Sequence, residues 1–148
     1  GQPSKYAHAI VAYNFRMEEI QAAVLNVKLS YLDDWNNGRR GRAARYSELL
    51  SDTGLVLPRE MEYARHVYHV YAVQSDNRDE LQKRLAAKGI QTGVHYPIPI
   101  HLQPAYASLG YKVGDLPVTE RLSERVLSLP LYAELTDDQQ RAVADAIR

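Results

Sequence analysis

The apolar positions of residues 17–32 recur at spacings of three and four, which place side chains on one face of an α-helix. Three leucines widen this stripe, so the pattern predicts a helix that is buried over a broad face. Asn14 lies where the N-cap of such a helix is expected, and Glu18 and Glu19 suit the positive end of its dipole. The stripe consists of Met17, Ile20, Val24, Val27 and Tyr31, widened by Leu25, Leu29 and Leu32.

The helical pattern fades at residues 35–38 and then resumes to about Asp52. One unbroken helix over 15–52 would span about 57 Å at about 1.5 Å per residue, whereas globular helices usually run roughly 8–20 residues. We therefore predict a break or kink near Asn37-Gly38. Basic residues follow this point, and such a run is more typical of a solvated helix face than of phosphate contacts. They are Arg39, Arg40, Arg42 and Arg45.

Short strand patterns alternate with helix patterns through the rest of the chain. Residues 67–73 are rich in β-branched and aromatic side chains and carry the strongest strand signal. Helices around a few short strands indicate the α+β class. Weaker strand patterns occupy 55–58, 90–94 and 127–130. Helices are expected at 77–88 with Leu81 and Leu85 inward and Gly89 as the stop, at 104–108 as a short turn, at 117–126 from Pro117, and from Thr136, which opens a capping-box pattern with Gln139.

Composition narrows the class of protein. A length of 148 residues suits one domain with a real core. The 18 basic and 18 acidic residues balance, which removes the electrostatic argument for a nucleic-acid or anionic-membrane partner. No apolar run approaches the roughly 18 residues that cross a bilayer. The chain has no cysteine, which excludes disulfides, thiolate metal sites and thiol nucleophiles and makes the cytoplasm the default compartment.

The segment His95–Tyr106 concentrates the candidate chemistry. His95 and His101 are separated by a stretch that Pro97 and Pro99 stiffen, and Tyr96 adds a further polar tip. So many hydrogen-bonding side chains on a stiff backbone favour a pocket wall over a packing segment.

Other site classes have weaker support. His66 and His69 are three apart in a predicted strand and would point to opposite faces, and no carboxylate is close in sequence to His95 and His101, so a metal site is disfavoured. Neither a nucleophile elbow nor a glycine-rich phosphate loop is present. Asn14, at a predicted helix N-terminus, is either an ordinary N-cap or an amide donor to a phosphate.

Three segments then resemble the signatures of one family, in that family's order and spacing. Residues 13–23 look like its Gly-x-Asn-x-Arg-Met-x-x-x-Gln-Ala-Ala signature, residues 89–106 contain its His-Tyr-Pro-x-Pro-x-His segment, and residues 127–136 resemble its C-terminal block. The family is the DegT/StrS family of sugar aminotransferases, and the resemblance covers nearly the whole chain.

The resemblance implies a pyridoxal-phosphate enzyme of the aspartate-aminotransferase fold, fold type I. Such enzymes transfer an amino group, usually from glutamate, to a keto group of a nucleotide-linked sugar, and work as dimers with shared active sites. Asn14 then matches the asparagine that reaches the cofactor phosphate across the dimer. His95, Tyr96 and His101 match residues near the sugar nucleotide. The His-Tyr-Pro-x-Pro-x-His form is most like members that aminate a 3-keto sugar.

One departure from the family decides what this chain is expected to do alone. The family's cofactor-binding lysine lies upstream of the block at Asn14, and none of the five lysines matches it: Lys5, Lys28, Lys83, Lys88 and Lys112. We therefore expect residues 1–148 to be the C-terminal small domain with its leading interdomain helix, without the large domain. The isolated chain is expected to be inactive and to hold no covalent cofactor.

Two alternatives stay open at this point. In the first, the chain is a stand-alone, non-catalytic dimerisation or binding domain, in which the apolar stripe on residues 17–32 drives self-association. Alternatively, it is a fragment of the family's dehydratase branch, in which a histidine replaces the lysine.

Overall fold

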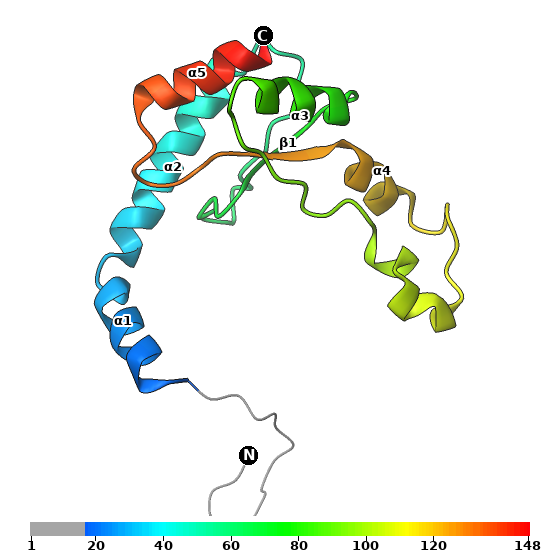
Figure 1. Cartoon of the computed structure of the whole chain (residues 1–148), viewed down its shortest axis with the longest axis horizontal. Coiled ribbons are helices and arrows are strands. Elements are labelled where there is room, and N and C mark those ends of the chain that lie inside the picture. The colour runs from blue at the N-terminus through cyan, green and yellow to red at the C-terminus, as the bar shows by residue number, and fades with distance from the viewer. Residues whose placement is uncertain (1–16) are drawn as a thin grey trace, which may run out of the picture. The chain divides into compact units, whose positions relative to one another are not determined.

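The computed structural model describes residues 17–148 of the chain (Figure 1). Two compact units divide the chain, residues 1–33 and residues 34–148. The predicted cofactor contact Asn14 lies outside the described residues.

Helix α1 spans Glu19–Leu29 and starts later than the sequence pattern indicates. Glu18 occupies its N-cap position with an extended backbone, so the prediction of Asn14 as the N-cap is wrong. The predicted burial is also wrong for this chain, because no residue of α1 is buried and Ile20 is 81% exposed. The periodicity correctly predicts a helix, but burial needs an opposing apolar surface, and spacing alone cannot supply that surface.

Helix α2 spans Leu32–Leu49 and contradicts the predicted break at Asn37-Gly38. The interruption lies earlier, at residues 30–31, and α2 continues without a break through Asn37 and Gly38. Long-range contacts explain the difference. A Cβ on Gly38 would lie 3.0 Å from the Ala133 Cβ, so this glycine permits a close approach, and Arg65 donates a 2.7 Å hydrogen bond to the Asn37 Oδ1 atom.

The arginine run on α2 is neither a phosphate cluster nor a solvated face. Arg40 bonds the Glu60 carboxylate at 2.6 Å and the His66 carbonyl at 2.7 Å. Arg42 and Arg45 both pair with Asp137 at the start of α5, which spans Asp137–Ile147. These side chains are only 28–30% exposed. The run therefore ties α2 to a distant loop and to the last helix.

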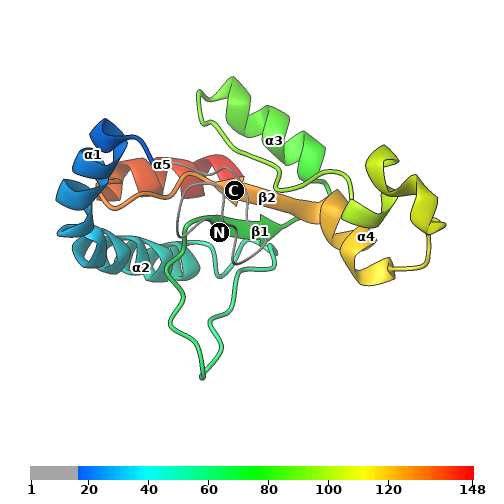
Figure 2. The ribbon, with the colours of Figure 1, turned by 90° about the horizontal axis from the view of Figure 1, so that it is seen from below.

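The sheet of the second unit consists of two antiparallel strands, β1 (Tyr71–Gln74) and β2 (Val126–Leu129), with Tyr71 opposite Leu129. Figure 2 shows them side by side. The predicted strand at 67–73 begins only at Tyr71, because Tyr68 has a φ of 48°, which is incompatible with a strand. The predicted strands at 55–58 and 90–94 are reduced to single bridges, Val56–Gln74 and Gly93–Ser128.

The remaining helices agree closely with the sequence pattern. Helix α3 spans Arg78–Ala87, α4 spans Pro117–Arg125, and α5 opens with the predicted capping box between Thr136 and Gln139. Short 3₁₀ helices cover Ile100–Leu102 and Pro104–Leu109. Within residues 34–148, helices and one small antiparallel sheet form one compact unit, as the α+β class predicts.

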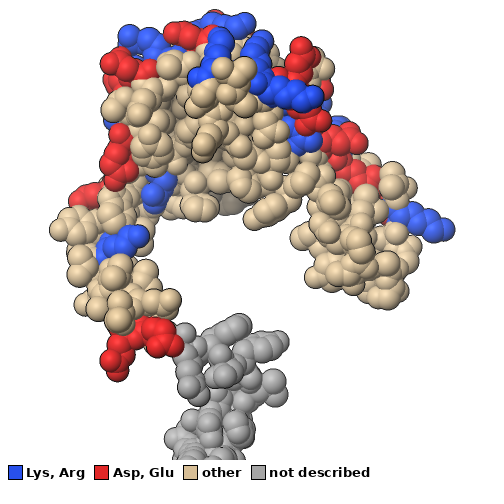
Figure 3. Space-filling view, in the orientation of Figure 1, with Lys and Arg blue, Asp and Glu red and all other residues tan. Residues whose placement is uncertain are grey.

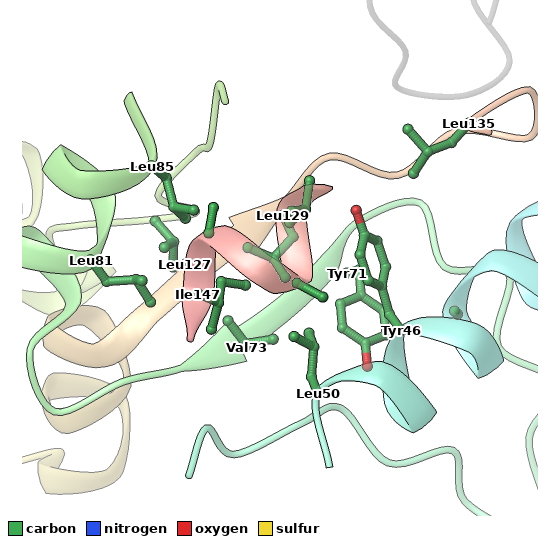
Figure 4. Close-up of a cluster of buried hydrophobic side chains, with 14 of the residues drawn as sticks. Tyr46, Leu50, Tyr71, Val73, Leu81, Leu85, Leu127, Leu129, Leu135 and Ile147 are labelled. Atoms are coloured by element: carbon green, nitrogen blue, oxygen red, sulfur yellow. The ribbon is translucent and has the colours of Figure 1, made fainter. Parts of the chain in front are cut away.

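The core joins α2, α3, α5 and both strands. Figure 4 shows Leu85, Leu127 and Ile147 near one end of the cluster and the rings of Tyr46 and Tyr71 at the other. These rings lie 5.2 Å apart, and their hydroxyl groups reach the Pro130 carbonyl at 3.1 Å and the Ser47 hydroxyl at 2.9 Å. Burial raises the pKa of both tyrosines. Leu81 and Leu85 are buried, as predicted.

Candidate functional site

His95 is held from two sides by chain segments that pair with each other. The Gly93 amide donates to the Ser128 carbonyl at 3.1 Å, and the Ser128 amide donates to the Gly93 carbonyl at 2.7 Å. The His95 Nδ1 atom lies 2.9 Å from the Ser128 Oγ atom. A Cβ on Gly93 would lie 2.6 Å from the Cε1 atom of the same ring. Backbone pairing and a missing side chain together therefore position the imidazole.

Tyr96 continues this site on the exposed side. Its ring meets the His95 ring edge to face, with 5.5 Å between the ring centroids and an interplanar angle of 90°. The peptide bond between the two residues is cis. Tyr96 is 73% exposed, so the structure brings these two predicted substrate contacts together and leaves the tyrosine accessible.

A hollow of about 310 Å³ lies beside His95. Its walls come from the loop before β1, the segment that precedes His95, and the end of β2. The lining residues are His69, Val70, Gln91, Thr92, Gly93, His95, Ser128, Leu129, Pro130 and Leu131. The sequence pattern predicts that His95 lines a pocket wall, but it gives no indication that His69 and Ser128 line the same hollow. The only sequence signal for Ser128 was its place in the C-terminal block of residues 127–136.

His101, the third predicted substrate contact, does not line that hollow. It is 8% exposed, and its Nε2 atom lies 2.9 Å from the Glu120 Oε1 atom. A carboxylate only accepts, so the His101 Nε2–H donates to it. The Tyr111 ring packs edge-on against the imidazole at 5.9 Å. The structure thus gives the buried His101 side chain a protein partner, and its contact with substrate stays a prediction.

Glu120 gathers further hydrogen bonds around His101. Its carboxylate accepts from the Gly114 amide at 2.8 Å and from the Leu116 amide at 3.1 Å. The bond from Gly114 is the main reason that the pKa of Glu120 is lowered, and the bond from His101 contributes to the same shift. This cluster fixes the loop at residues 110–116 against α4.

Metal binding finds no support in the part of the chain that the structure describes. His66 accepts a 2.7 Å bond from the Tyr68 amide through its Nδ1 atom. No three histidine, aspartate or glutamate side chains among residues 17–148 gather as a possible metal site. Over the same residues, no helix combines the length and apolar character that a bilayer-spanning segment requires.

Pyridoxal phosphate, the cofactor that the resemblance implies, requires a lysine amine for its covalent attachment. In residues 34–148 the lysines are Lys83, Lys88 and Lys112, and all three are exposed and absent from the hollow at His95. The described residues of this unit therefore do not fit covalent attachment of the cofactor at this hollow. They supply polar groups to the wall of the hollow.

Comparison with known proteins gives a consistent result. The sequence profile of the DegT/DnrJ/EryC1/StrS aminotransferase family matches residues 1–148. A pleiotropic regulatory protein of Geobacillus stearothermophilus is 45% identical over 99% of the chain, and the match covers 40% of that protein. A dTDP-3-amino-3,4,6-trideoxy-alpha-D-glucose transaminase of Streptomyces venezuelae is 42% identical over 100% of the chain and 39% of its own length.

A solved structure extends this similarity to the fold. The crystal structure of S. venezuelae DesV in complex with a ketimine intermediate matches 99% of this chain with a TM-score of 0.93 and 41% identity. The match covers 40% of the DesV chain, so residues 1–148 span about two-fifths of the length of these relatives. The chain belongs to the DegT/DnrJ/EryC1/StrS aminotransferase family.

Proposed function

We propose that residues 1–148 form the C-terminal small domain of an enzyme that transfers an amino group to a keto group of a nucleotide-linked sugar. The observation that carries this proposal is the hollow of about 310 Å³ that the imidazoles of His69 and His95 help to line, with Ser128 bonded to His95. The exposed Tyr96 ring packs edge to face against His95 next to this hollow. Rings and hydrogen-bonding groups at one hollow suit a sugar nucleotide, which offers both apolar faces and many oxygens.

In this proposal the chain binds and orients the substrate and leaves the bond-making chemistry to residues outside it. Pyridoxal phosphate, held by a lysine elsewhere in the complete enzyme, supplies the electron sink for amino transfer, with glutamate as the amino donor. Asn14 contacts the cofactor phosphate from the partner subunit. His95, Tyr96 and His101 lie at the sugar nucleotide. His101 also bonds Glu120, which holds its imidazole in place.

A chimera tests this proposal. The 39% of the S. venezuelae transaminase that matches this chain is replaced by residues 1–148. We expect the chimera to aminate the keto sugar substrate of that transaminase with glutamate. His95→Ala and Tyr96→Ala should each raise KM for the sugar nucleotide, because each removes a substrate contact.

The control is Lys83→Ala, which changes an exposed residue of α3 that is absent from the hollow and should leave KM unchanged. A folded chimera that binds pyridoxal phosphate but aminates no nucleotide sugar would contradict the proposal. Separately, pyridoxal phosphate added to the 148-residue chain should give no visible absorbance from a lysine-bound cofactor. Such a band would refute the proposal that the lysine that holds the cofactor lies outside this chain.

A second candidate function is self-association, and the surface of α1 favours it. An apolar groove of about 470 Å³ runs along this helix and is lined by Met17, Ile20, Gln21, Val24 and Leu25. Exposed apolar patches of this kind mark interaction surfaces. In a dimerisation domain this face would contact a second copy of the chain, and in a homodimeric aminotransferase it would do the same.

A further inference from the structure

The hydroxyl group of Ser128 has one hydrogen-bond partner among residues 17–148, the His95 Nδ1 atom at 2.9 Å. Ser128 is 5% exposed, and its backbone amide and carbonyl are both paired with Gly93. If Nδ1 carried the proton and donated it to the Oγ atom, the hydroxyl's own proton would have no acceptor in the described protein. A buried donor without an acceptor costs free energy. The direction that satisfies both groups within the described protein therefore has the hydroxyl donating to Nδ1.

This direction determines the state of the imidazole. In the neutral ring one nitrogen accepts and the other carries the proton, so an accepting Nδ1 leaves the proton on Nε2. No residue in the described range 17–148 bonds the Nε2 atom of His95. His95 also lines the hollow of about 310 Å³. The ring thus offers one unused N–H donor at that hollow.

Gly93 holds the same ring from the other side. A Cβ at this position would lie 2.6 Å from Cε1 and 3.2 Å from Nε2, distances at which the imidazole must move. The two backbone hydrogen bonds between Gly93 and Ser128 keep the glycine and the hydroxyl in fixed register. Any change to either residue therefore acts on His95 through direct contact with the ring.

We propose that Gly93 and Ser128 are positioning residues that hold His95 as its Nε2–H tautomer, a hydrogen-bond donor to an oxygen atom of the bound sugar nucleotide. The identity of the ligand rests on the proposed function. The tautomer is a property of the chain and can be tested without any ligand.

The first test is ¹⁵N NMR of the histidine side chains in the 148-residue chain, at a pH where the imidazoles are neutral. His95 should show an unprotonated Nδ1 and a protonated Nε2. Ser128→Ala should produce a detectable Nδ1–H population, and Ser128→Thr, which keeps a hydroxyl, should restore the wild-type pattern.

The matched control for this test is Ser123→Ala. Ser123 is also buried, but its hydroxyl donates to the Thr119 carbonyl at 2.9 Å, so His95 should keep its wild-type spectrum. A protonated Nδ1 in the wild-type chain would overturn the proposal, and this result does not depend on whether any variant folds. An unchanged His95 spectrum in a folded Ser128→Ala variant would overturn it as well.

The second test uses the chimeric transaminase described above. Ser128→Ala and Gly93→Ala should raise KM for the sugar nucleotide several-fold with a much smaller change in kcat, because both act on a substrate contact. Ser128→Thr should recover the wild-type KM. A wild-type KM in both alanine variants would overturn the positioning role. An inactive parent chimera would instead refute the proposed function, while the NMR result still decides the tautomer.

Discussion

Glu120 combines three hydrogen bonds on one side chain and connects His101 to the loop at residues 110–116. Its Oε1 atom accepts from His101 and Leu116, and its Oε2 atom accepts from Gly114. Both oxygens must accept for the whole cluster to persist. A glutamine offers one accepting oxygen and one amide group that only donates, so it cannot replace all three bonds.

We predict that Glu120→Gln loosens this loop without unfolding the domain. Amide hydrogen exchange at Gly114 or Leu116 should become several-fold faster, because at least one of these amides loses its acceptor. Glu124→Gln, one turn further along α4, is the control, since that exposed carboxylate has no hydrogen bond in the described structure. Unchanged exchange at both amides in Glu120→Gln would show that the cluster does not hold the loop.

The same carboxylate makes the stability of the domain sensitive to acid. The pKa of Glu120 is lowered in the folded state from its usual 4.5, first by the Gly114 amide. A lowered folded-state pKa stabilises the protein above the ordinary carboxyl pKa, and this contribution is lost as the pH falls through the folded-state value. The pKa of Glu60 is lowered as well, mainly by the hydrogen bond from the Arg40 guanidinium. Protonation of Glu60 in acid therefore also lowers the free energy of unfolding.

Urea unfolding at a series of pH values from neutrality to about pH 3 would measure this loss. The free energy of unfolding should fall below the ordinary carboxyl pKa, and the fall should be shallower in Glu120→Gln than in the wild type. Parallel pH profiles for the two proteins would exclude a contribution from Glu120.

Among the structural elements, α2 shows how a distant contact sets the course of a helix. Gly38 faces Ala133, and the first atom of any side chain there would meet both the Cβ atom at 3.0 Å and the Cα atom at 3.3 Å. Gly41, three residues along the same helix, has nothing within 4 Å of the corresponding position. The two glycines therefore share a helical backbone but differ in surroundings.

We predict opposite effects of alanine at these two positions. Gly41→Ala should raise the free energy of unfolding by up to about 1 kcal/mol, because alanine favours the helix. Gly38→Ala gains the same preference but crowds a backbone atom, and over-packing typically costs about 1–3 kcal/mol. We expect a net loss of about 1 kcal/mol, seen as a melting temperature lower by about 2–4 °C. Equal stabilisation by both substitutions would show that the loop at Ala133 yields freely.

The elements that the sequence predicted well are those with local causes. Pro117 and the Thr136–Gln139 capping box act within one turn of their own helices, so α4 and α5 begin where these residues indicate. The continuous α2 and the shortened β1 were mispredicted, because a contact to Ala133 and the left-handed backbone of Tyr68 decide them. Neither cause leaves a periodic pattern.

In the candidate site, too, the residues with a local sequence signal were predicted and those brought in by long-range contacts were not. His95 and Tyr96 stand out in the sequence because they lie together in a proline-stiffened segment. Ser128 bonds His95 from 33 positions away, and Glu120 bonds His101 from 19 positions away. Only the folded chain brings these pairs together, so neither partner could be predicted from spacing.

At the scale of the whole molecule, each of the two units carries an exposed apolar surface. In the first unit this is the face of α1. In the second it is the arm at residues 96–116, where Leu109 is 63% and Val113 80% exposed and where Figure 3 shows few charged side chains. Isolated exposed apolar residues are common, but contiguous ones indicate contact surfaces. The chain spans about 40% of the length of its relatives, and we propose that both surfaces are covered in a complete enzyme.

The face of α1 should make the 148-residue chain self-associate, because Ile20 and Val24, one helical turn apart, are 81% and 53% exposed. Sedimentation velocity over a range of concentrations should show a species larger than a monomer. The double substitution Ile20→Glu and Val24→Glu should shift it to the monomer, since burying two carboxylates in an apolar contact is costly. As a control, Leu109→Glu with Val113→Glu adds the same charge to the arm and should leave the association unchanged. A wild-type chain that stays monomeric at high concentration, or an association abolished only by the arm variant, would show that α1 is not the contact surface.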